Sequence, residues 1–317
     1  MSQIVSNTLE KIMPLPNYAQ IEVTTRCNFR CGTCSRESLP KNRLNRDMTL
    51  DEFKNIHRQI NTLKIVKLQG LGEPFLNKYL DEILDYCNSM GIECTTICNG
   101  SIIPNSETLG KFSNIIISID SAYKDTFEEY RSGGNFHKII ENIKQIIQYK
   151  KDGLLKNTTI RINSVLTHLN YQEIENIYKL ACELEVYKLE FVEVENWYIE
   201  SQSEYLSSLD FIKESRKVSQ NIKSKIDDLQ TVNMPIRVGH IASTPRKNTC
   251  TWPFNNVFIT VDGFITPCCI RMDPNVFNFG NIYEEEFTDI WNGDKYVSFR
   301  EANLSGSKNI VCDNCPN

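Results

Sequence analysis

The sequence predicts an α/β fold, a partial (β/α)6 TIM-like barrel followed by a small C-terminal module. One observation predicts the barrel and a second predicts the separate module. Between residues 19 and 194, short apolar runs alternate with amphipathic stretches, and this strand and helix unit occurs six times. From Cys250 onward the alternation stops and cysteines gather. We therefore expect a barrel domain over residues 1–235 and a module of a different kind over residues 236–317.

Six strands are expected in the barrel, at residues 21–25, 64–69, 93–98, 114–120, 159–166 and 188–194. Apolar residues recur at helical spacing between them, for example over residues 80–87, 139–147 and 174–184. Thr49 with Glu52, and Asn170 with Glu173, have the spacing of capping boxes that open two helices. Six units favour an open partial barrel over a closed one of eight. The active site of such a barrel lies at the carboxyl ends of its strands.

After the sixth strand, the pattern predicts a helical segment, a connector and a compact tail. Residues 203–230 are charged and have a helical pattern, and residues 234–247 are expected to form the connector. Asp262-Gly263 is a turn signal typical of a β-hairpin. The tail is therefore expected to hold a hairpin and two short helices, over residues 257–267, 285–291 and 295–302.

Composition and charge argue against several classes of function. The chain has 317 residues and a net charge of only −5, without the basic stripe that a phosphate backbone would require. Nucleic acid is therefore not expected as the principal partner. Residues 1–16 lack the features of a secretory signal, and no stretch approaches the roughly 18 apolar residues of a membrane span. We expect a cytoplasmic protein with no membrane partner. Its twelve cysteines then favour reduced thiols and metal sites over disulfides.

The first cysteine group lies directly after the first predicted strand. Cys27, Cys31 and Cys34 form a CxxxCxxC triplet on one short loop. Three thiolates so placed suit a 4Fe-4S cluster whose fourth iron has no protein ligand and stays open to a substrate or cosubstrate. Zinc is the alternative. A structural zinc ion would need a fourth Cys or His nearby, and His57 does not stand at a customary spacing.

The triplet and the residues that follow later strands resemble the radical S-adenosylmethionine (SAM) superfamily. Gly70, Gly72, Glu73 and Pro74 are similar to the glycine-rich segment that receives the amino group of SAM in that family. Further positions match the family pattern in order and are expected to bind SAM: Asn99, Ser118, Asp120 and Arg131. Asn163, within the fifth predicted strand, is also expected to face SAM. Four of these features also have an interpretation without SAM. Gly-Glu-Pro and Asn99 could form turns, Asp120 could cap a helix, and Arg131 could form a surface ion pair.

The resemblance implies the cofactors and the first chemical step. A 4Fe-4S cluster on the triplet receives an electron from an external donor, such as a flavodoxin or ferredoxin, and passes it to bound SAM. SAM is then cleaved to methionine and a 5'-deoxyadenosyl radical, which abstracts a hydrogen atom from carbon. The negative charge of Glu73 is expected to face the amino group of SAM.

A second cysteine group lies in the C-terminal module. Cys250, Cys268, Cys312 and Cys315 supply enough thiolates for a further iron-sulfur cluster, with zinc again the alternative. The segment resembles the SPASM module or its shortened form, Twitch, which implies a small C-terminal iron-sulfur module. Because no cysteine follows Cys315, one auxiliary 4Fe-4S cluster is expected. Cys268 is favoured as its ligand over Cys269, whose thiol either packs as a small apolar group or acts as a catalytic hydrogen-atom donor.

Three reactions are compatible with these residues. A dehydrogenase would pass an electron from the substrate radical to the auxiliary cluster, and an epimerase would quench that radical with a thiol such as Cys269. A peptide-modifying enzyme usually carries an N-terminal recognition module, and few residues precede the first strand. We therefore favour a small, carbohydrate-like metabolite as the substrate. An iron-sulfur electron carrier is the alternative outside enzymes, and Cys87 and Cys182 are expected in the core.

Overall fold

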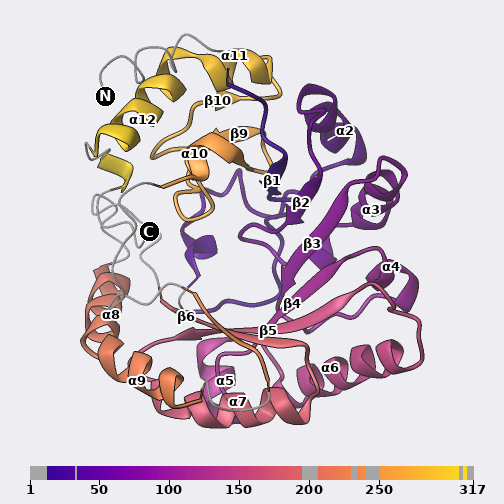
Figure 1. Cartoon of the computed structure of the whole chain (residues 1–317), viewed down its shortest axis with the longest axis vertical. Coiled ribbons are helices and arrows are strands. Elements are labelled where there is room, and N and C mark those ends of the chain that lie inside the picture. The colour runs from indigo at the N-terminus through magenta and orange to yellow at the C-terminus, as the bar shows by residue number, and fades with distance from the viewer. Residues whose placement is uncertain are drawn as a thin grey trace.

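One curved sheet runs through the molecule in the computed structural model. The structure describes residues 13–32, 34–194, 206–229, 234–239, 250–306 and 310–312. Within these residues the sheet has ten strands, in the order β10-β9-β8-β1-β2-β3-β4-β5-β6-β7. Figure 1 shows the strands curving around the centre of the molecule, with helices on the outer side. The predicted α/β class with a partial barrel is confirmed.

Seven neighbouring strands of the sheet are parallel. They are β1 (Tyr18–Ile21), β2 (Ile65–Leu68), β3 (Glu93–Cys98), β4 (Asn114–Ser118), β5 (Thr159–Leu166), β6 (Lys188–Glu193) and β7 (Ile236–Val238). The bounds of β3 and β5 match the prediction, whereas β1 begins three residues before the predicted strand. The short strand β7 lies within the predicted connector. Its three residues are too few for an alternating pattern to stand out.

Helices cover the outer side of the parallel strands (Figure 1). They are α2 (Leu50–Gln59), α3 (Leu80–Ser89), α4 (Ser106–Gly110), α5 (Lys124–Tyr130), α6 (Phe136–Lys151), α7 (Ile174–Glu183), α8 (Leu206–Lys217) and α9 (Ser219–Leu229). Helix α2 opens with the predicted capping box, in which the Thr49 N–H donates to Glu52 Oε2 at 2.7 Å. None of the described helices is both long and apolar enough to cross a bilayer.

The second predicted capping box is wrong. The side-chain nitrogen of Asn170 donates to the carbonyls of Asp120 and Val165, at 2.7 and 2.8 Å, and no side-chain cap bond forms at Asn170. Glu173 accepts from the hydroxyl of Ser121 instead of turning back to Asn170. Both side chains thus bond groups near the ends of β4 and β5, where buried backbone groups require partners.

The C-terminal module extends the same sheet. Strand β8 (Asn256–Ile259) pairs in parallel with β1, and β9 (Phe264–Thr266) returns antiparallel to β8. Gly263 sits in the turn between them at φ +89°, so the predicted hairpin is confirmed. The rest of the module contains α10 (Trp252–Asn255), β10 (Gly280–Asn281), α11 (Phe287–Asn292) and α12 (Asp294–Ser305). Helices α11 and α12 correspond to the two predicted tail helices.

Two cysteines predicted in the core have different environments. Cys87 is fully buried on α3, as predicted, whereas Cys182 is exposed. The buried face of α7 carries Ile177 and Ala181. Because each residue of a helix is rotated by about 100° from the one before, Cys182 is turned away from that face. The prediction for Cys182 is therefore wrong.

A buried ion network joins the barrel to the C-terminal hairpin. Arg43 Nη2 lies 3.2 Å from Glu22 Oε2, and Arg43 Nε lies 3.0 Å from Asp262 Oδ2. Glu22 also accepts the backbone N–H groups of Leu71 and Val261, at 3.0 and 3.2 Å. Burial raises the pKa of the Glu22 carboxyl, and the nearby Arg43 guanidinium opposes this rise. The network fixes the glycine-rich segment and the hairpin relative to β1.

Candidate active site

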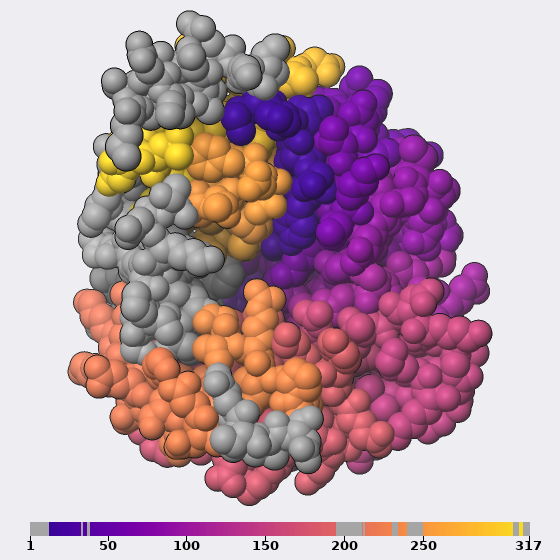
Figure 2. Space-filling model, viewed as in Figure 1, coloured from indigo at the N-terminus to yellow at the C-terminus, as the bar shows by residue number. Residues whose placement is uncertain are grey.

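A cavity of about 400 Å³ lies inside the barrel, where the C-terminal module meets the strands. Figure 2 shows the module, in orange and yellow, beside the indigo N-terminal part of the barrel. Side chains from β1 to β6, from the cysteine loop and from the segment after β9 form its walls. The predicted site residues that line it are Cys27, Cys31, Cys34, Gly70, Gly72, Glu73, Asn99, Ser118, Arg131, Asn163 and Cys269. The size is typical of a small-molecule site.

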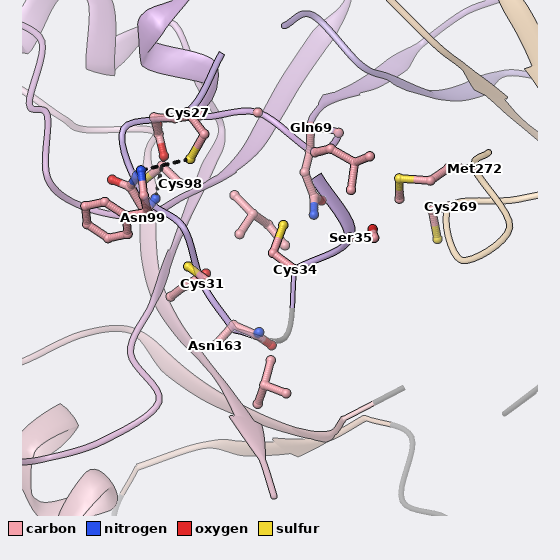
Figure 3. Close-up of a pocket in the computed structure, with 18 of the residues that line it drawn as sticks. Cys27, Cys31, Cys34, Ser35, Gln69, Cys98, Asn99, Asn163, Cys269 and Met272 are labelled. Carbon is pink, nitrogen blue, oxygen red and sulfur yellow. Dashed lines mark hydrogen bonds between the residues drawn. The ribbon is translucent and has the colours of Figure 1, made fainter. Parts of the chain in front are cut away.

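The cysteine triplet occupies the loop after β1 and faces this cavity (Figure 3). The Cys34 N–H donates to the Cys31 carbonyl at 3.0 Å, which makes the loop tight. Burial raises the pKa of all three thiols, that of Cys31 to about 12. In the described part of the chain, no three His, Cys, Asp or Glu side chains lie close enough together to coordinate one metal ion as they stand. The thiols share a cavity, and a bound cation would favour their thiolate forms.

Glu73 lines the cavity and is 2% exposed. Its Oε2 accepts the Asn99 N–H at 2.7 Å and its Oε1 accepts the Phe75 N–H at 3.2 Å. Burial raises the pKa of the carboxyl to about 7, and these N–H groups oppose the rise. The Asn99 side chain donates to Asn28 Oδ1 at 2.9 Å. The two predicted segments, after β2 and after β3, thus meet at one carboxylate.

The glycines before Glu73 are required by packing. A Cβ on Gly70 would lie 2.3 Å from the Glu22 side chain, and one on Gly72 would lie 2.3 Å from the Thr24 carbonyl. Both are distances that real side chains do not reach. These glycines therefore let the segment close against β1 and the cysteine loop. Pro74 begins a short 3-10 helix and does not line the cavity.

Arg131 and Asp120 form a buried pair beside the triplet. Arg131 Nη2 lies 2.7 Å from Asp120 Oδ2, and the other carboxylate oxygen accepts the Val165 N–H at 2.8 Å. Arg131 lines the cavity, whereas Asp120 does not. Asp120 therefore pairs with Arg131 instead of capping a helix, and the Arg131 ion pair is buried instead of lying at the surface. Ser118 and Asn163, which also line the cavity, are direct partners across β4 and β5.

Several lining residues were not predicted from the sequence. Gln20, Lys67 and Gln69 line the wall made by β1 and β2, and Met272 lies near Cys269 (Figure 3). A signal was present in the sequence, because Lys67 stands between apolar residues in a central strand. A polar residue there has to face the inside of a barrel or solvent.

Two family models match the chain. The model of the radical SAM superfamily matches residues 21–181, just over half of the sequence, and that of the SPASM iron-sulfur cluster-binding domain matches residues 250–316. The chain belongs to the radical SAM superfamily. Its cofactors are the superfamily's 4Fe-4S cluster, SAM and an auxiliary iron-sulfur centre in the SPASM module.

Known radical SAM proteins resemble the chain along most of its length. A GTP 3',8-cyclase from Peptoclostridium acidaminophilum is 28% identical over 270 residues, 80% of each protein. The structure of Streptococcus suis SuiB bound to precursor peptide SuiA matches with a TM-score of 0.71 at 18% identity, over 94% of this chain and 69% of SuiB. BtrN in complex with AdoMet and 2-DOIA matches with a TM-score of 0.53 at 18% identity, over 96% of this chain and 94% of BtrN. The structural matches establish the fold.

The SPASM module of this radical SAM protein contains buried polar atoms without partners. Among the described residues, these atoms are Trp252 Nε1, Thr266 Oγ1, Tyr296 OH and Arg300 Nη2. Buried donors of this kind fit a group that offers acceptor atoms, as the sulfurs of a cluster do. Burial raises the pKa of the Tyr296 hydroxyl, and the nearby Cys268 thiol raises it further.

One described cysteine of the module faces the barrel cavity. Cys269 lines this cavity, whereas Cys250, Cys268 and Cys312 do not. Cys315 lies outside the described residues. The three thiols of the triplet line the barrel cavity together with the buried carboxyl of Glu73, which can accept from an amino group. The residues present are therefore compatible with both iron-sulfur centres and with SAM.

Proposed function

We propose that this radical SAM enzyme abstracts a hydrogen atom from a carbon of a small, carbohydrate-like metabolite, and that dehydrogenation or epimerisation follows. The single observation that carries the proposal is that Cys269, from the SPASM module, lines the same small cavity as Cys27, Cys31 and Cys34. A substrate held there lies between the triplet and the module. When bound, the cluster and SAM supply a 5'-deoxyadenosyl radical.

The chain's own residues have separate roles in this proposal. Cys27, Cys31 and Cys34 ligate the first cluster. Glu73 accepts a hydrogen bond from the amino group of SAM, and Asn99, Ser118, Arg131 and Asn163 contact the rest of it, with Asp120 positioning Arg131. Cys250, Cys268, Cys312 and Cys315 ligate one auxiliary 4Fe-4S cluster. A flavodoxin or ferredoxin supplies the electron, and the division between barrel and module falls near residue 235.

Release of 5'-deoxyadenosine tests the enzyme class. Anaerobically reconstituted protein with dithionite and SAM is expected to form 5'-deoxyadenosine and methionine, measured by liquid chromatography and mass spectrometry. Cys34→Ala should reduce both to background because the triplet loses a ligand. Cys182→Ala, at an exposed cysteine, is the matched control and should leave both unchanged. Intact clusters without 5'-deoxyadenosine would instead favour the electron carrier.

The fate of the Cys269 hydrogen distinguishes epimerisation from dehydrogenation. In an epimerase its S–H bond breaks as the hydrogen atom moves to the substrate radical, so the product formed in D₂O gains one deuterium. The thiyl radical left on Cys269 then takes one electron from the external donor and one proton from solvent, which restores the thiol. In a dehydrogenase the substrate radical loses a proton and gives an electron to the auxiliary cluster, and no deuterium enters. Cys269→Ala should abolish deuterium uptake while 5'-deoxyadenosine still forms. Unchanged uptake in Cys269→Ala would exclude this thiol as the donor.

A peptide substrate is the second candidate, because SuiB with its bound precursor peptide matches 94% of this chain. The test compares the rate of 5'-deoxyadenosine formation with added peptides and with added sugar-like metabolites. If a peptide is the substrate, added peptide should increase this rate. Stimulation by peptides alone would replace the small metabolite in the proposal.

A further inference from the structure

The wall of the cavity made by β1 and β2 carries an ammonium group without a counter-ion. Lys67 lies on β2 and lines the cavity. Within the described ranges, its Nζ makes no hydrogen bond or ion pair that would neutralise it. Withdrawing an ammonium from water is costly unless an anion or several acceptors surround it.

The acidic group that acts electrostatically on Lys67 already has a partner. Glu190, on β6, forms an ion pair with Arg237 on β7, with 3.3 Å between Oε1 and Nε. The electrostatic neighbours of Lys67 are Cys269, Glu190 and Arg237. Burial lowers the pKa of the ammonium, and Cys269 and Glu190 only partly oppose this effect.

Two amides extend the polar wall around Lys67. Gln20 on β1 is the direct register partner of Lys67, and its Nε2 donates to the Gln69 carbonyl at 3.2 Å. Gln69 Oε1 is buried and accepts no hydrogen bond from any described residue. All three residues line the cavity. The ammonium is the group that suits an oxygen anion, and the unpartnered Gln69 oxygen suits a donor beside it, such as a hydroxyl of the same substrate.

The position of this wall favours the substrate over SAM. Lys67 lies within β2, whereas Glu73, which we propose to receive the amino group of SAM, lies in the segment after that strand. Lys67 is therefore set apart, along the strand, from the proposed partner of the SAM amino group.

We propose that Lys67, with Gln20 and Gln69, forms a subsite for an anionic oxygen group of the substrate, a carboxylate or a phosphate. This inference rests on the proposed function and narrows it to an acidic or phosphorylated metabolite. Lys67 is then a specificity residue, because a neutral analogue would leave the ammonium unpaired.

Anion titration of the reconstituted, SAM-saturated enzyme tests the subsite. Malonate represents the carboxylate and pyrophosphate the phosphate, and each is titrated calorimetrically at constant ionic strength. We expect one of them to bind, and Lys67→Met to raise its Kd roughly tenfold or more. Lys67→Arg should restore binding. Lys64→Met, at the exposed lysine before β2, is the matched control and should bind like the wild type.

Three results would overturn the subsite. They are no binding of either anion, equal binding by the wild type and Lys67→Met, and binding that occurs only when SAM is omitted. The last result would assign Lys67 to the carboxylate of SAM. Iron content and circular dichroism confirm that Lys67→Met is folded and loaded. Because 5'-deoxyadenosine formation without substrate is measured separately, failure of the subsite and failure of the proposed function give different outcomes.

Discussion

At the scale of single residues, the site depends on buried groups whose charge is set by their surroundings. Glu73 is the clearest example, since burial holds its pKa near 7 although two backbone N–H groups donate to it. A carboxylic acid in this state changes charge within the physiological range. Its interaction with an amino group therefore depends on pH.

Affinity for SAM should fall on acidification because Glu73 becomes neutral. With a pKa of about 7, only about a tenth of the protein carries the Glu73 carboxylate at pH 6, against about nine tenths at pH 8. If SAM binds the carboxylate form, the apparent Kd should rise about tenfold between pH 8 and pH 6. Equilibrium dialysis of SAM against the reconstituted enzyme measures this change.

Two variants show whether the pH dependence of SAM affinity comes from Glu73 or from the ionisation of SAM itself. Glu73→Gln should bind SAM more weakly at pH 8 and show less dependence on pH, whereas Glu107→Gln, at an exposed position, should follow the wild type. A wild-type Kd that does not change between pH 6 and pH 8 would contradict the role of Glu73.

The sequence allowed some of these residues to be predicted and concealed others. The triplet and Glu73 stand in short contiguous motifs, so a local pattern was enough to find them. Lys67 belongs to the site because β2 turns it toward the cavity. Its place among apolar residues marked it as unusual, but a four-residue strand has too little alternation to show which face is inside. Asn170 was assigned to a helix cap because one of its partners, the carbonyl of Asp120 after β4, lies 50 residues away in the sequence.

At the scale of elements, the Arg43 network holds the loop, strand and hairpin in one arrangement. The Arg43 and Glu22 side chains are 5% and 1% exposed. Removing one partner from such a pair leaves an uncompensated charge. Arg43→Met should therefore lower the free energy of unfolding by about 3–5 kcal/mol at pH 8, measured by urea denaturation.

The pH dependence of this loss identifies its cause. Burial already raises the pKa of Glu22, and loss of Arg43 raises it further. A raised carboxyl pKa means that the folded state takes up a proton at a pH where the unfolded state does not, so stability increases as the pH falls. The deficit of Arg43→Met should be smaller at pH 6 than at pH 8. Arg58→Met removes a pair that is more than 60% exposed and should cost less than about 1 kcal/mol at either pH.

At the scale of the whole molecule, the SPASM module and the barrel share one sheet. The hairpin of the module was predicted because the Asp-Gly turn is a local signal. Its parallel pairing with β1 was not predicted, because the pairing joins Tyr18 to Asn256 across most of the chain. No local pattern encodes so distant a contact. The shared sheet connects the auxiliary centre to the strand that precedes the triplet.

Loss of the auxiliary cluster should therefore be detectable in β1. Cys268→Ala removes a proposed ligand, and if one 4Fe-4S cluster is lost the iron content should fall by about four atoms per chain, leaving the cluster of the triplet. Hydrogen exchange should then become faster in β8 and β9 and along β1, whose backbone pairs with β8. Cys269→Ala is the matched control at the adjacent cysteine, and its iron content and exchange should match those of the wild type. Iron loss in Cys269→Ala with retention in Cys268→Ala would reverse the assignment of ligand and cavity thiol.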